Sequence, residues 1–336
     1  MHTEAYPVTL PDGRTFSAQG DETLLDAAQR QGIVFNYSCR TGRCSSCRGR
    51  IITGSTIAQQ TETGLTEAEC QQGFILTCVR QALGPVQLDI SDLGNISMPE
   101  TRTVPCRILS LTPLAPDVLH VVLRLPPTVT VDFIPGQYID IIGPGGLRRS
   151  YSIANAPRAD RSIELHIREV NGGAMSQYWF HTAKINDLLR LRGPLGTFFL
   201  RGQAEKDLVF LATGTGIAPI KAILEGLSKL QTEAQPRSIS VYWGGRHEED
   251  LYWTPNQFQN VRFVPVLSRG QSTWAGARGH VQDILLNEHP ILESVQVYAC
   301  GSEAMISSAR SQLLAAGLPP DQFHSDAFVA STSAAA

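Results

Sequence analysis

Four of the seven cysteines in this 336-residue chain have a spacing that can hold an inorganic redox cluster. Cys39, Cys44 and Cys47 lie in one short loop, YSCRTGRCSSC, and Cys78 follows in a separate segment. Three thiolates from one loop can surround a small cluster while a fourth closes it, so this spacing indicates a [2Fe–2S] site. Zinc is the less favoured alternative, because zinc sites usually combine two C-x2-C pairs. Buried thiols without a metal are the other alternative.

Small and basic residues accompany these cysteines. Gly42, Ser45 and Ser46 leave room for backbone N–H groups to point at the sulfur atoms, and such hydrogen bonds help to set a cluster's reduction potential. Four arginines lie in or next to the loop: Arg40, Arg43, Arg48 and Arg50. They form either an ordinary solvated surface or a docking surface for an acidic partner.

A second group of motifs contains the residue types that bind a flavin dinucleotide. RRSYS (148–152) includes R-x-Y-S, PGQY (135–138) precedes it, and NGGAMS (171–176) leads into a predicted helix. The pyrophosphate of a dinucleotide is doubly negative, and an arginine and the N–H groups of a helix start are natural partners for it. R-x-Y-S alone could equally belong to an ordinary strand.

A third group could bind a nicotinamide dinucleotide. In LVFLATGTGIAPI (208–220) a strand runs into a turn where Gly214 and Gly216 let the backbone approach a pyrophosphate. Pro219 is typical of a first helical turn, although a lone G-T-G also occurs in turns without a ligand. YACGS (298–302) places Cys300 at the end of a strand, where open α/β sheets bind ligands. A small core residue is the alternative for this cysteine.

The charged stretch GGRHEEDLYW (244–253) follows the second strand of this region, where the adenine ribose of a dinucleotide would lie. Glu248, Glu249 and Asp250 would repel the 2′-phosphate of NADPH, whereas Arg246 would attract it. The balance favours NADH over NADPH. A solvated charged turn would explain the same residues without a ligand.

The composition is that of an ordinary globular protein, with 42% apolar residues, 18% charged residues and a formal net charge of −3. It fits neither a basic nucleic-acid-binding protein nor a disordered chain. We see no secretory signal, and no run of about 18 uncharged apolar residues could span a membrane. We therefore expect a cytoplasmic protein, in which clustered cysteines hold metal or perform redox chemistry.

The motifs fall into three predicted domains. Residues 1–91 contain a hairpin, one helix that ends at Gly32, the cysteine loop and further short strands, which together predict a small α+β domain. Residues 92–102 are predicted to be a linker. Over 103–203 the predicted strands are VPCRILSLTPL, VLHVVLRLPP, GQYIDIIG, RRSYSIANAP and SIELHIREV, followed by a helix at 174–182. These alternating strands predict an antiparallel barrel or sandwich. Over 204–330 strands alternate with helices, which predicts a parallel sheet, and residues 331–336 form a tail.

With these motifs in place, residues 1–91 resemble the plant-type ferredoxin module, and residues 103–330 resemble the ferredoxin–NAD(P)H reductase family. The resemblance implies a multidomain protein: a β-grasp ferredoxin domain, a β-barrel FAD domain and an α/β NAD domain. The sequence departs from the family at Thr213, where G-G-T-G is usual, and at Ser45, where reductase-linked members often have glycine.

The resemblance also implies roles for individual residues. Arg149 would bind the flavin phosphates, Tyr151 would pack along the flavin, and Ser152 would hydrogen-bond near flavin N5, where hydride arrives. Cys300 would lie beside the nicotinamide ring, so Ser152 and Cys300 are the predicted catalytic residues. The other predicted cofactor-binding residues are Ser150, His166, Ile167, Arg168, Gly172, Gly173 and Ser176 for the flavin, Gly214, Thr215, Gly216, Ala218, Pro219, Arg246 and Gly301 for the nicotinamide dinucleotide, and Asp326 and Phe328 near the flavin.

The order of the domains predicts an electron path from NADH through FAD and the [2Fe–2S] cluster to a partner enzyme. A hydride carries two electrons and the cluster accepts one, so a flavin is needed between them. Within the family the chain is most similar to the CDP-6-deoxy-Δ3,4-glucoseen reductases, in stretches such as GQYIDII, GPLGTFFL and VYACGS. This likeness implies that the acceptor is a dehydrase of 3,6-dideoxy-sugar formation, and the alternative acceptor is a Rieske or di-iron oxygenase.

Two hypotheses of other kinds use the same motifs. An electron carrier or redox-responsive binding protein would hold the cofactors without oxidising NADH. A reductase that releases free reduced flavin would not need the fused ferredoxin domain.

Overall fold

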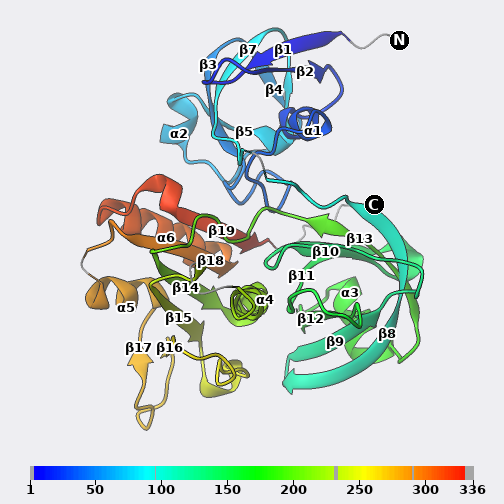
Figure 1. Ribbon diagram of the computed structural model, residues 1–336, viewed down its shortest axis with the longest axis vertical. Helices are drawn as coiled ribbons and strands as arrows, with labels where there is room; N and C mark the ends of the chain where they lie inside the picture. Colours follow the sequence, from blue (N-terminus) through cyan, green and yellow to red (C-terminus); the bar gives the residue numbers. More distant parts are fainter. Residues whose placement is uncertain (1–3, 95, 231–233, 290, 330–336) are drawn as a thin grey trace. The chain divides into compact units, whose positions relative to one another are not determined.

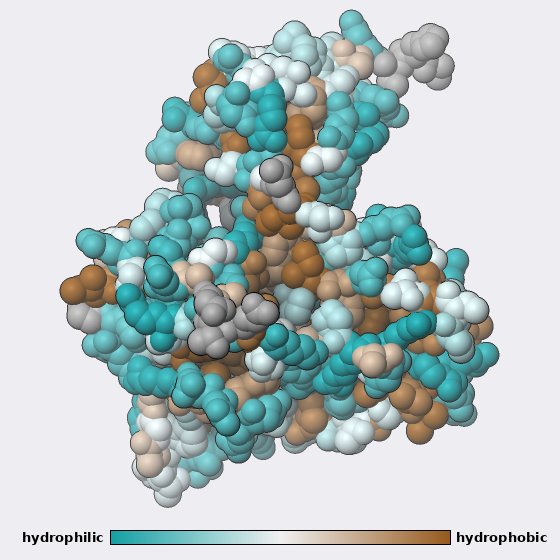
Figure 2. Space-filling model, viewed as in Figure 1, coloured by the Kyte–Doolittle hydropathy of each residue, from teal (hydrophilic) through white to brown (hydrophobic). Residues whose placement is uncertain are grey.

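A computed structural model shows the predicted fold classes (Figure 1). The structure describes residues 4–94, 96–230, 234–289 and 291–329. These residues form two compact units, one within residues 4–98 and one over Pro99–Phe328. Most of the surface that is visible in Figure 2 is hydrophilic. Within the described ranges, no helix is long and apolar enough to cross a membrane.

The first unit is an α+β fold on a five-stranded sheet with the order β2-β1-β7-β3-β5. β1 runs parallel to β7, and the other neighbours are antiparallel. The predicted hairpin is β1–β2, in which Val8 pairs with Phe16. A separate ribbon joins β4 and β6. The elements of this unit are β1 (Ala5–Thr9), β2 (Thr15–Gln19), α1 (Leu24–Arg30), β3 (Arg48–Thr53), β4 (Thr56–Ala58), α2 (Glu67–Gln71), β5 (Phe74–Leu76), η1 (Thr77–Val79), β6 (Arg80–Ala82) and β7 (Val86–Asp89).

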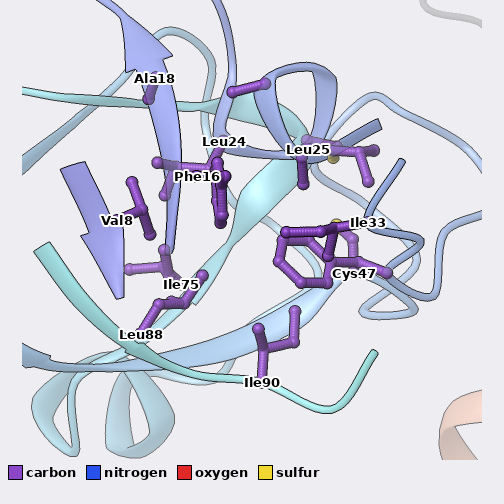
Figure 3. Packing of buried hydrophobic residues seen from close by; sticks show 14 of the residues in the cluster. Val8, Phe16, Ala18, Leu24, Leu25, Ile33, Cys47, Ile75, Leu88 and Ile90 are labelled. Carbon is purple, nitrogen blue, oxygen red and sulfur yellow. The ribbon is translucent and has the colours of Figure 1, made fainter. Parts of the chain in front are cut away.

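Helix α1 supplies much of the core of this unit. The Thr23 hydroxyl caps its first turn by accepting a hydrogen bond from the Asp26 N–H, and its apolar residues are fully buried. The helix ends just before Gly32, whose φ of 79° suits the position after a helix C-terminus, as predicted. Figure 3 shows Cys47 next to Ile33 at one end of this core. The core therefore extends to the cysteine loop.

The expectation of a single helix in this unit is wrong, because α2 follows the cysteine loop. None of its residues is buried, so it has no apolar stripe to reveal it. Its sequence signal is a capping box: the Thr66 hydroxyl accepts a hydrogen bond from the Glu69 N–H, and the Glu69 carboxylate accepts one from the Thr66 N–H.

The second unit begins with a six-stranded antiparallel sheet of order β11-β10-β13-β8-β9-β12. A bridge between Ile153 and Leu165 joins its two ends, so the sheet closes into the predicted barrel. β13 was missing from the predicted strands, although buried Leu189 and Leu191 flank exposed Arg190 in an alternating pattern. The elements are β8 (Arg102–Ala115), β9 (Val118–Arg124), β10 (Tyr138–Ile142), η2 (Pro144–Gly146), β11 (Arg148–Ser152), β12 (Ile163–Arg168), α3 (Ala174–Gln177), η3 (Tyr178–Thr182) and β13 (Leu188–Leu195).

A six-stranded parallel sheet of order β17-β16-β15-β14-β18-β19 completes the second unit. Helix α4 lies on the side of this sheet that faces the barrel, and α5 and α6 lie on the other side (Figure 1). The strand order reverses between β14 and β18, which is where ligands bind such sheets. The elements are β14 (Asp207–Thr213), η4 (Gly214–Gly216), α4 (Ile217–Leu227), β15 (Ser238–Gly245), η6 (Glu248–Asp250), β16 (Val261–Leu267), β17 (Ala277–Arg278), α5 (Val281–Glu288), β18 (Val295–Ser302), α6 (Glu303–Ala315), η7 (Pro320–Gln322) and β19 (Phe323–Phe328).

Candidate cofactor sites

The four predicted cluster ligands lie together at one end of the first unit. Three come from the loop between α1 and β3, and Cys78 comes from η1. The carbonyl of Cys47 accepts hydrogen bonds from the N–H and the hydroxyl of Thr77, at 3.1 and 3.0 Å, which ties the two segments together. The thiols interact in two pairs, Cys39 with Cys44 and Cys47 with Cys78.

This pairing fits a two-iron cluster better than a single metal ion. A [2Fe–2S] cluster is held by four thiolates around two irons. Backbone N–H groups also reach the sulfurs: those of Thr41 and Cys39 each lie 3.4 Å from a thiol, of Cys39 and Cys44 respectively. Hydrogen bonds from the Cys44 thiol, from Thr41 and from the Arg43 N–H lower the pKa of Cys39 to about 5, which favours the metal-binding thiolate.

The loop depends on unusual backbone conformations. Gly42 has a φ of 74°, and a Cβ added there would lie 2.8 Å from the carbonyl oxygen of Thr61. Ser45 also has a positive φ, 60°, which gives a physical reason for the glycine that reductase-linked members often have there. In this chain the Ser45 hydroxyl donates to the carbonyl of Gly64 and holds the loop in place.

Two of the four arginines near the cluster are paired within their own unit. Arg40 bonds Asp26 and lies over the Tyr37 ring, and Arg48 bonds Glu69 and lies over the Phe74 ring. The Arg50 guanidinium donates to the backbone carbonyl of Gln72. The acids offset part of the positive charge, so the electrostatic field around the loop is weaker than the sequence alone implies. The acidic partner remains a prediction.

The predicted flavin residues cluster around β11 and the helix that follows β12. Arg149 and Tyr151 share one face of β11, and the Tyr151 hydroxyl accepts a hydrogen bond of 3.0 Å from the indole N–H of Trp179. Burial raises the pKa of Tyr151, so its phenol stays neutral. Ser152 is buried at the end of the same strand. Trp179 was not among the predicted residues, because its contact depends on the barrel bringing η3 to β11.

The glycine segment before α3 has the open backbone that a phosphate needs. Gly172 has a φ of 72° with open space around its α-carbon, and Gly173 is the N-cap residue of α3. The Ser176 hydroxyl accepts a hydrogen bond of 2.9 Å from the Val170 N–H, which fixes the loop and leaves its own hydrogen free to donate.

Strand β12 divides its side chains between the barrel core and the parallel-sheet domain. Ile167 is buried in the barrel core, so its side chain faces away from the dinucleotide sites. His166 lies on the opposite face, with its Nδ1 3.2 Å from the Tyr252 hydroxyl, and burial lowers its pKa to about 3. Ser150, on β11, donates to the carboxylate of Asp140. The roles of His166, Ile167 and Ser150 at the flavin remain predictions.

Arg168 connects the two dinucleotide-binding regions. Its guanidinium bonds Asp117 of the barrel domain at 2.7 Å and Asp250 of the parallel-sheet domain at 2.6 Å. The same guanidinium lies 2.8 Å from where a Cβ on Gly214 would stand. A residue predicted to line the flavin is therefore also in contact with the G-T-G turn.

The G-T-G turn packs directly on the strand end that carries Cys300. A Cβ on Gly216 would lie only 2.1 Å from the Cys300 carbonyl oxygen, so only glycine fits there. The Thr213 hydroxyl accepts a hydrogen bond of 3.1 Å from the Ser302 N–H, which is a local function for the residue that replaces the usual glycine. Burial and the neighbouring Asp326 raise the pKa of Cys300, so it remains a neutral thiol.

The remaining predicted residues surround this turn and the adjacent strand end. Asp326 pairs in register with Cys300 on the neighbouring strand, and Phe328 is partly exposed at the end of β19. Thr215 is buried in η4, and Ala218 and Pro219 are buried in the first turn of α4, which confirms a proline in the first helical turn. The sequence-predicted residues of the nicotinamide site are thus brought together, with Arg246 at a separate turn after β15.

One of the three acids expected to repel NADPH is turned inward. The Asp250 carboxylate accepts hydrogen bonds from the backbone N–H groups of Arg246 and His247 and pairs with Arg168. Glu248 and Glu249 are exposed, and the Arg246 side chain is 59% exposed. The charges available to a coenzyme at this turn are therefore two carboxylates and one guanidinium, rather than the three carboxylates that the sequence suggests.

Comparison with known proteins agrees with this arrangement. The chain matches the 2Fe-2S iron-sulfur cluster binding domain over residues 8–83, the oxidoreductase FAD-binding domain over 105–200 and the oxidoreductase NAD-binding domain over 210–311. The fold and its sites therefore define a ferredoxin reductase-like flavoprotein with a fused ferredoxin domain, an NAD(P)H-dependent oxidoreductase.

Relatives that match over nearly the whole chain identify the family within this class. The chain is 41% identical to the CDP-6-deoxy-L-threo-D-glycero-4-hexulose-3-dehydrase reductase of Yersinia pestis, over 96% of this chain and 97% of that protein. It is 31% identical to terephthalate 1,2-dioxygenase reductase component 2 of Comamonas, over 93% and 94%. The crystal structure of the cytochrome P450 reductase GcoB of Amycolatopsis superposes with a TM-score of 0.76 at 27% identity, covering 96% and 98%. The chain belongs to the family of iron–sulfur flavoprotein reductases that includes the Yersinia and Comamonas proteins.

The backbone of the cluster loop can be tested with an alanine at Gly42. Gly42→Ala forces a side chain into a left-handed conformation, at a cost of about 1–2 kcal/mol, and against the Thr61 carbonyl. We expect purified protein to contain substantially less iron and sulfide per chain. Gly84→Ala is the matched control, since a Cβ there meets nothing within 4 Å. Full iron and sulfide content in Gly42→Ala would contradict the role of this contact.

The function of Thr213 can be tested by removing its hydroxyl. Thr213→Val removes the acceptor for the Ser302 N–H, a hydrogen bond worth about 0.5–1.5 kcal/mol, so we expect KM for NADH to rise about two- to tenfold. FAD content should not change. Thr213→Ser retains the acceptor and should behave like the unchanged protein. Equal KM values in the valine and serine variants would show that the hydrogen bond has no influence on coenzyme binding.

Proposed function

We propose that this enzyme transfers electrons from NADH, through FAD and the [2Fe–2S] cluster, to a partner enzyme. A bound FAD would supply the chemistry that links the two-electron donor, a hydride, to the one-electron cluster. The observation that carries the proposal is the contact of Arg168, from the barrel strand β12, with the Gly214 turn of the parallel-sheet domain. This contact brings the two candidate dinucleotide sites together.

The chain's own residues perform the binding and orientation. Arg149 would supply a cation for the flavin phosphates. Trp179 fixes the hydroxyl of Tyr151, the ring of which would pack along the flavin. Gly216 brings the G-T-G turn against Cys300, whose neutral thiol would place no charge beside a bound nicotinamide. The four paired thiols hold the cluster.

We propose NADH as the preferred coenzyme on the charges of the turn after β15. Glu248 and Glu249 are both exposed there and oppose a 2′-phosphate, whereas Arg246 alone favours one. Because Asp250 is turned inward, the preference should be moderate. The ratio of kcat/KM for NADH to that for NADPH measures it.

For the acceptor, we propose a dehydrase that acts on a CDP-linked 6-deoxy-4-hexulose. The support is the 41% identity to the Yersinia pestis dehydrase reductase, against 31% to the Comamonas dioxygenase reductase component. An oxygenase is the alternative acceptor. We also propose that the arginines of the cluster loop contribute to docking an acidic surface of the partner, through whichever charges Asp26 and Glu69 do not offset.

Two further points remain proposals. We propose the domain boundaries 1–91, 103–203 and 204–330, which enclose the three matched regions. We propose a cytoplasmic location, because a cluster held by four thiolates needs cysteines that stay reduced, as they do in the cytosol. A carrier that does not oxidise NADH is the alternative from another class, and membership of a reductase family weighs against it.

The order of the electron path can be tested at the fourth cluster ligand. Cys78→Ala should abolish NADH-dependent reduction of cytochrome c, which needs the cluster, while ferricyanide reduction through the flavin continues. Cys70→Ala is the matched control, since Cys70 is exposed in the same unit. Loss of ferricyanide reduction from a Cys78→Ala protein that retains FAD would show that the order is wrong. If the protein without any substitution does not reduce ferricyanide with NADH, the alternative of an electron carrier that does not oxidise NADH is favoured.

The acceptor can be tested by reconstitution with purified partners. We expect NADH-dependent electron transfer to the Yersinia pestis dehydrase to be at least tenfold faster than to the Comamonas terephthalate dioxygenase, about 1.4 kcal/mol in barrier. Both are measured as NADH oxidation that depends on added acceptor. Faster transfer to the dioxygenase would identify an oxygenase reductase instead.

A further inference from the structure

Helix α4 carries two charged residues that are anchored in the barrel domain. Lys221 and Glu225 are four positions apart, so they lie on the same side of the helix. The ammonium of Lys221 donates to the carbonyl oxygen of Ala154 at 2.8 Å and bonds Glu164 at 2.9 Å. It also bonds Glu225 at 2.7 Å. One lysine thus connects the helix to two segments of the barrel domain.

Glu225 makes the second anchor. Its carboxylate accepts a hydrogen bond of 3.0 Å from the Ala156 N–H and pairs with Arg158 at 3.1 Å. Ala154 and Ala156 belong to the segment that directly follows Ser152. The two helix residues therefore hold one short stretch of barrel backbone by its carbonyl at one position and its N–H at another.

The charges in this cluster are well compensated. Glu164 is buried, and it bonds Arg158, Lys221 and, at 3.5 Å, His120. Burial would raise the pKa of Glu164, but hydrogen bonds and charge from His120, Lys221 and Arg158 outweigh it and lower the pKa. Buried ion pairs often add little net stability, because desolvation offsets the attraction. Stability alone is therefore a weak explanation for placing these charges at a domain contact.

The position of the anchors indicates what they do. Helix α4 begins at the G-T-G turn, and Lys221 lies five residues after Gly216, about 7.5 Å along the helix at a rise of about 1.5 Å per residue. Ala154 lies two residues after Ser152. The hydrogen bond between Lys221 and Ala154 thus joins the nicotinamide turn to the flavin strand through one helical segment and a few residues of extended chain.

We propose that Lys221 and Glu225 are positioning residues that set the separation between the G-T-G turn and the Tyr151–Ser152 strand for hydride transfer. The proposal rests on the proposed function. Hydride transfer requires a close approach of the reacting atoms, and a misplacement of about 1 Å can slow a reaction by about 100-fold. Loss of the anchor slows flavin reduction without removing either binding site.

The first test replaces the lysine in the holoenzyme. Lys221→Met keeps the aliphatic stem and removes the ammonium, while Glu164 retains Arg158 and His120. We expect FAD reduction at saturating NADH to slow about 10- to 100-fold in stopped-flow absorbance, with little change in KM and normal FAD content. Lys184→Met, which removes the charge of an exposed lysine on the barrel domain, is the matched control and should reduce its FAD at the unchanged rate.

A second measurement does not depend on activity. Hydrogen–deuterium exchange of peptides covering 152–160 should be faster in Lys221→Met, because the segment loses an anchor. Glu225→Gln keeps an oxygen for the Ala156 N–H and should have a smaller effect on both readouts. Lys221 and Glu225 hold the same segment, so their effects should not be independent. The fold-decrease in FAD reduction in the Lys221→Met/Glu225→Gln variant should be smaller than the product of the two single-variant decreases.

The outcomes separate this proposal from the proposed function. A Lys221→Met protein that loses melting temperature but reduces its FAD at the unchanged rate, with unchanged exchange over 152–160, would show a purely stabilising role and overturn the proposal. A Lys221→Met protein in which only KM for NADH rises, while the rate of FAD reduction at saturating NADH is unchanged, would also overturn it. If the unchanged protein does not reduce its FAD with NADH, the proposed function fails, whereas the exchange measurement still tests the anchor.

Discussion

The contact between strand β12 and the parallel-sheet domain is the interaction on which the reductase unit depends. Because side chains alternate along a strand, one face of β12 fills the barrel core while Glu164, His166 and Arg168 face the neighbouring domain. Each of the three contacts a different part of that domain: Glu164 reaches α4, His166 reaches Tyr252, and Arg168 reaches η6 and the G-T-G turn. A single strand therefore couples the core of the flavin domain to the elements that would hold the nicotinamide dinucleotide.

Close backbone contact sets a second constraint, at both ends of the proposed electron path. In the reductase unit, Gly216 lets its turn lie directly on the Cys300 carbonyl, and Thr213 secures the same strand end through Ser302. In the ferredoxin unit, Gly42 permits an equally close approach to Thr61, and Ser45 holds the loop to Gly64. In both places the glycine allows two backbone segments to approach closely, and a neighbouring hydroxyl makes the hydrogen bond that fixes the geometry.

The sequence predicted the features that depend on local pattern. Short-range signals predicted the strand–turn–helix at Gly214 and the helix that ends before Gly32, and the structure has both where expected. The spacing of the cysteines is a signal of the same kind. Helix α2 and strand β13 were missed, although a capping box and an alternating pattern marked them. Lys221, Trp179 and Asp117 could not be found this way, since their contacts join segments that are distant in sequence and meet only through the barrel and sheet topology. The alternation of apolar and polar residues in IELHIREV did indicate which side chains leave the barrel core, because it places Ile167 on one face and Glu164, His166 and Arg168 on the other.

Burial also keeps the ionisable groups around the two dinucleotide sites in fixed states. It lowers the pKa of His166 to about 3 and raises those of Tyr151 and Cys300, so near neutral pH all three remain uncharged. The charged groups beside them, Glu164 and Arg168, are held ionised by partners on both domains. None of these groups changes its charge in the physiological range. The electrostatic environment that these five groups create around the two dinucleotide sites is therefore set by the fold.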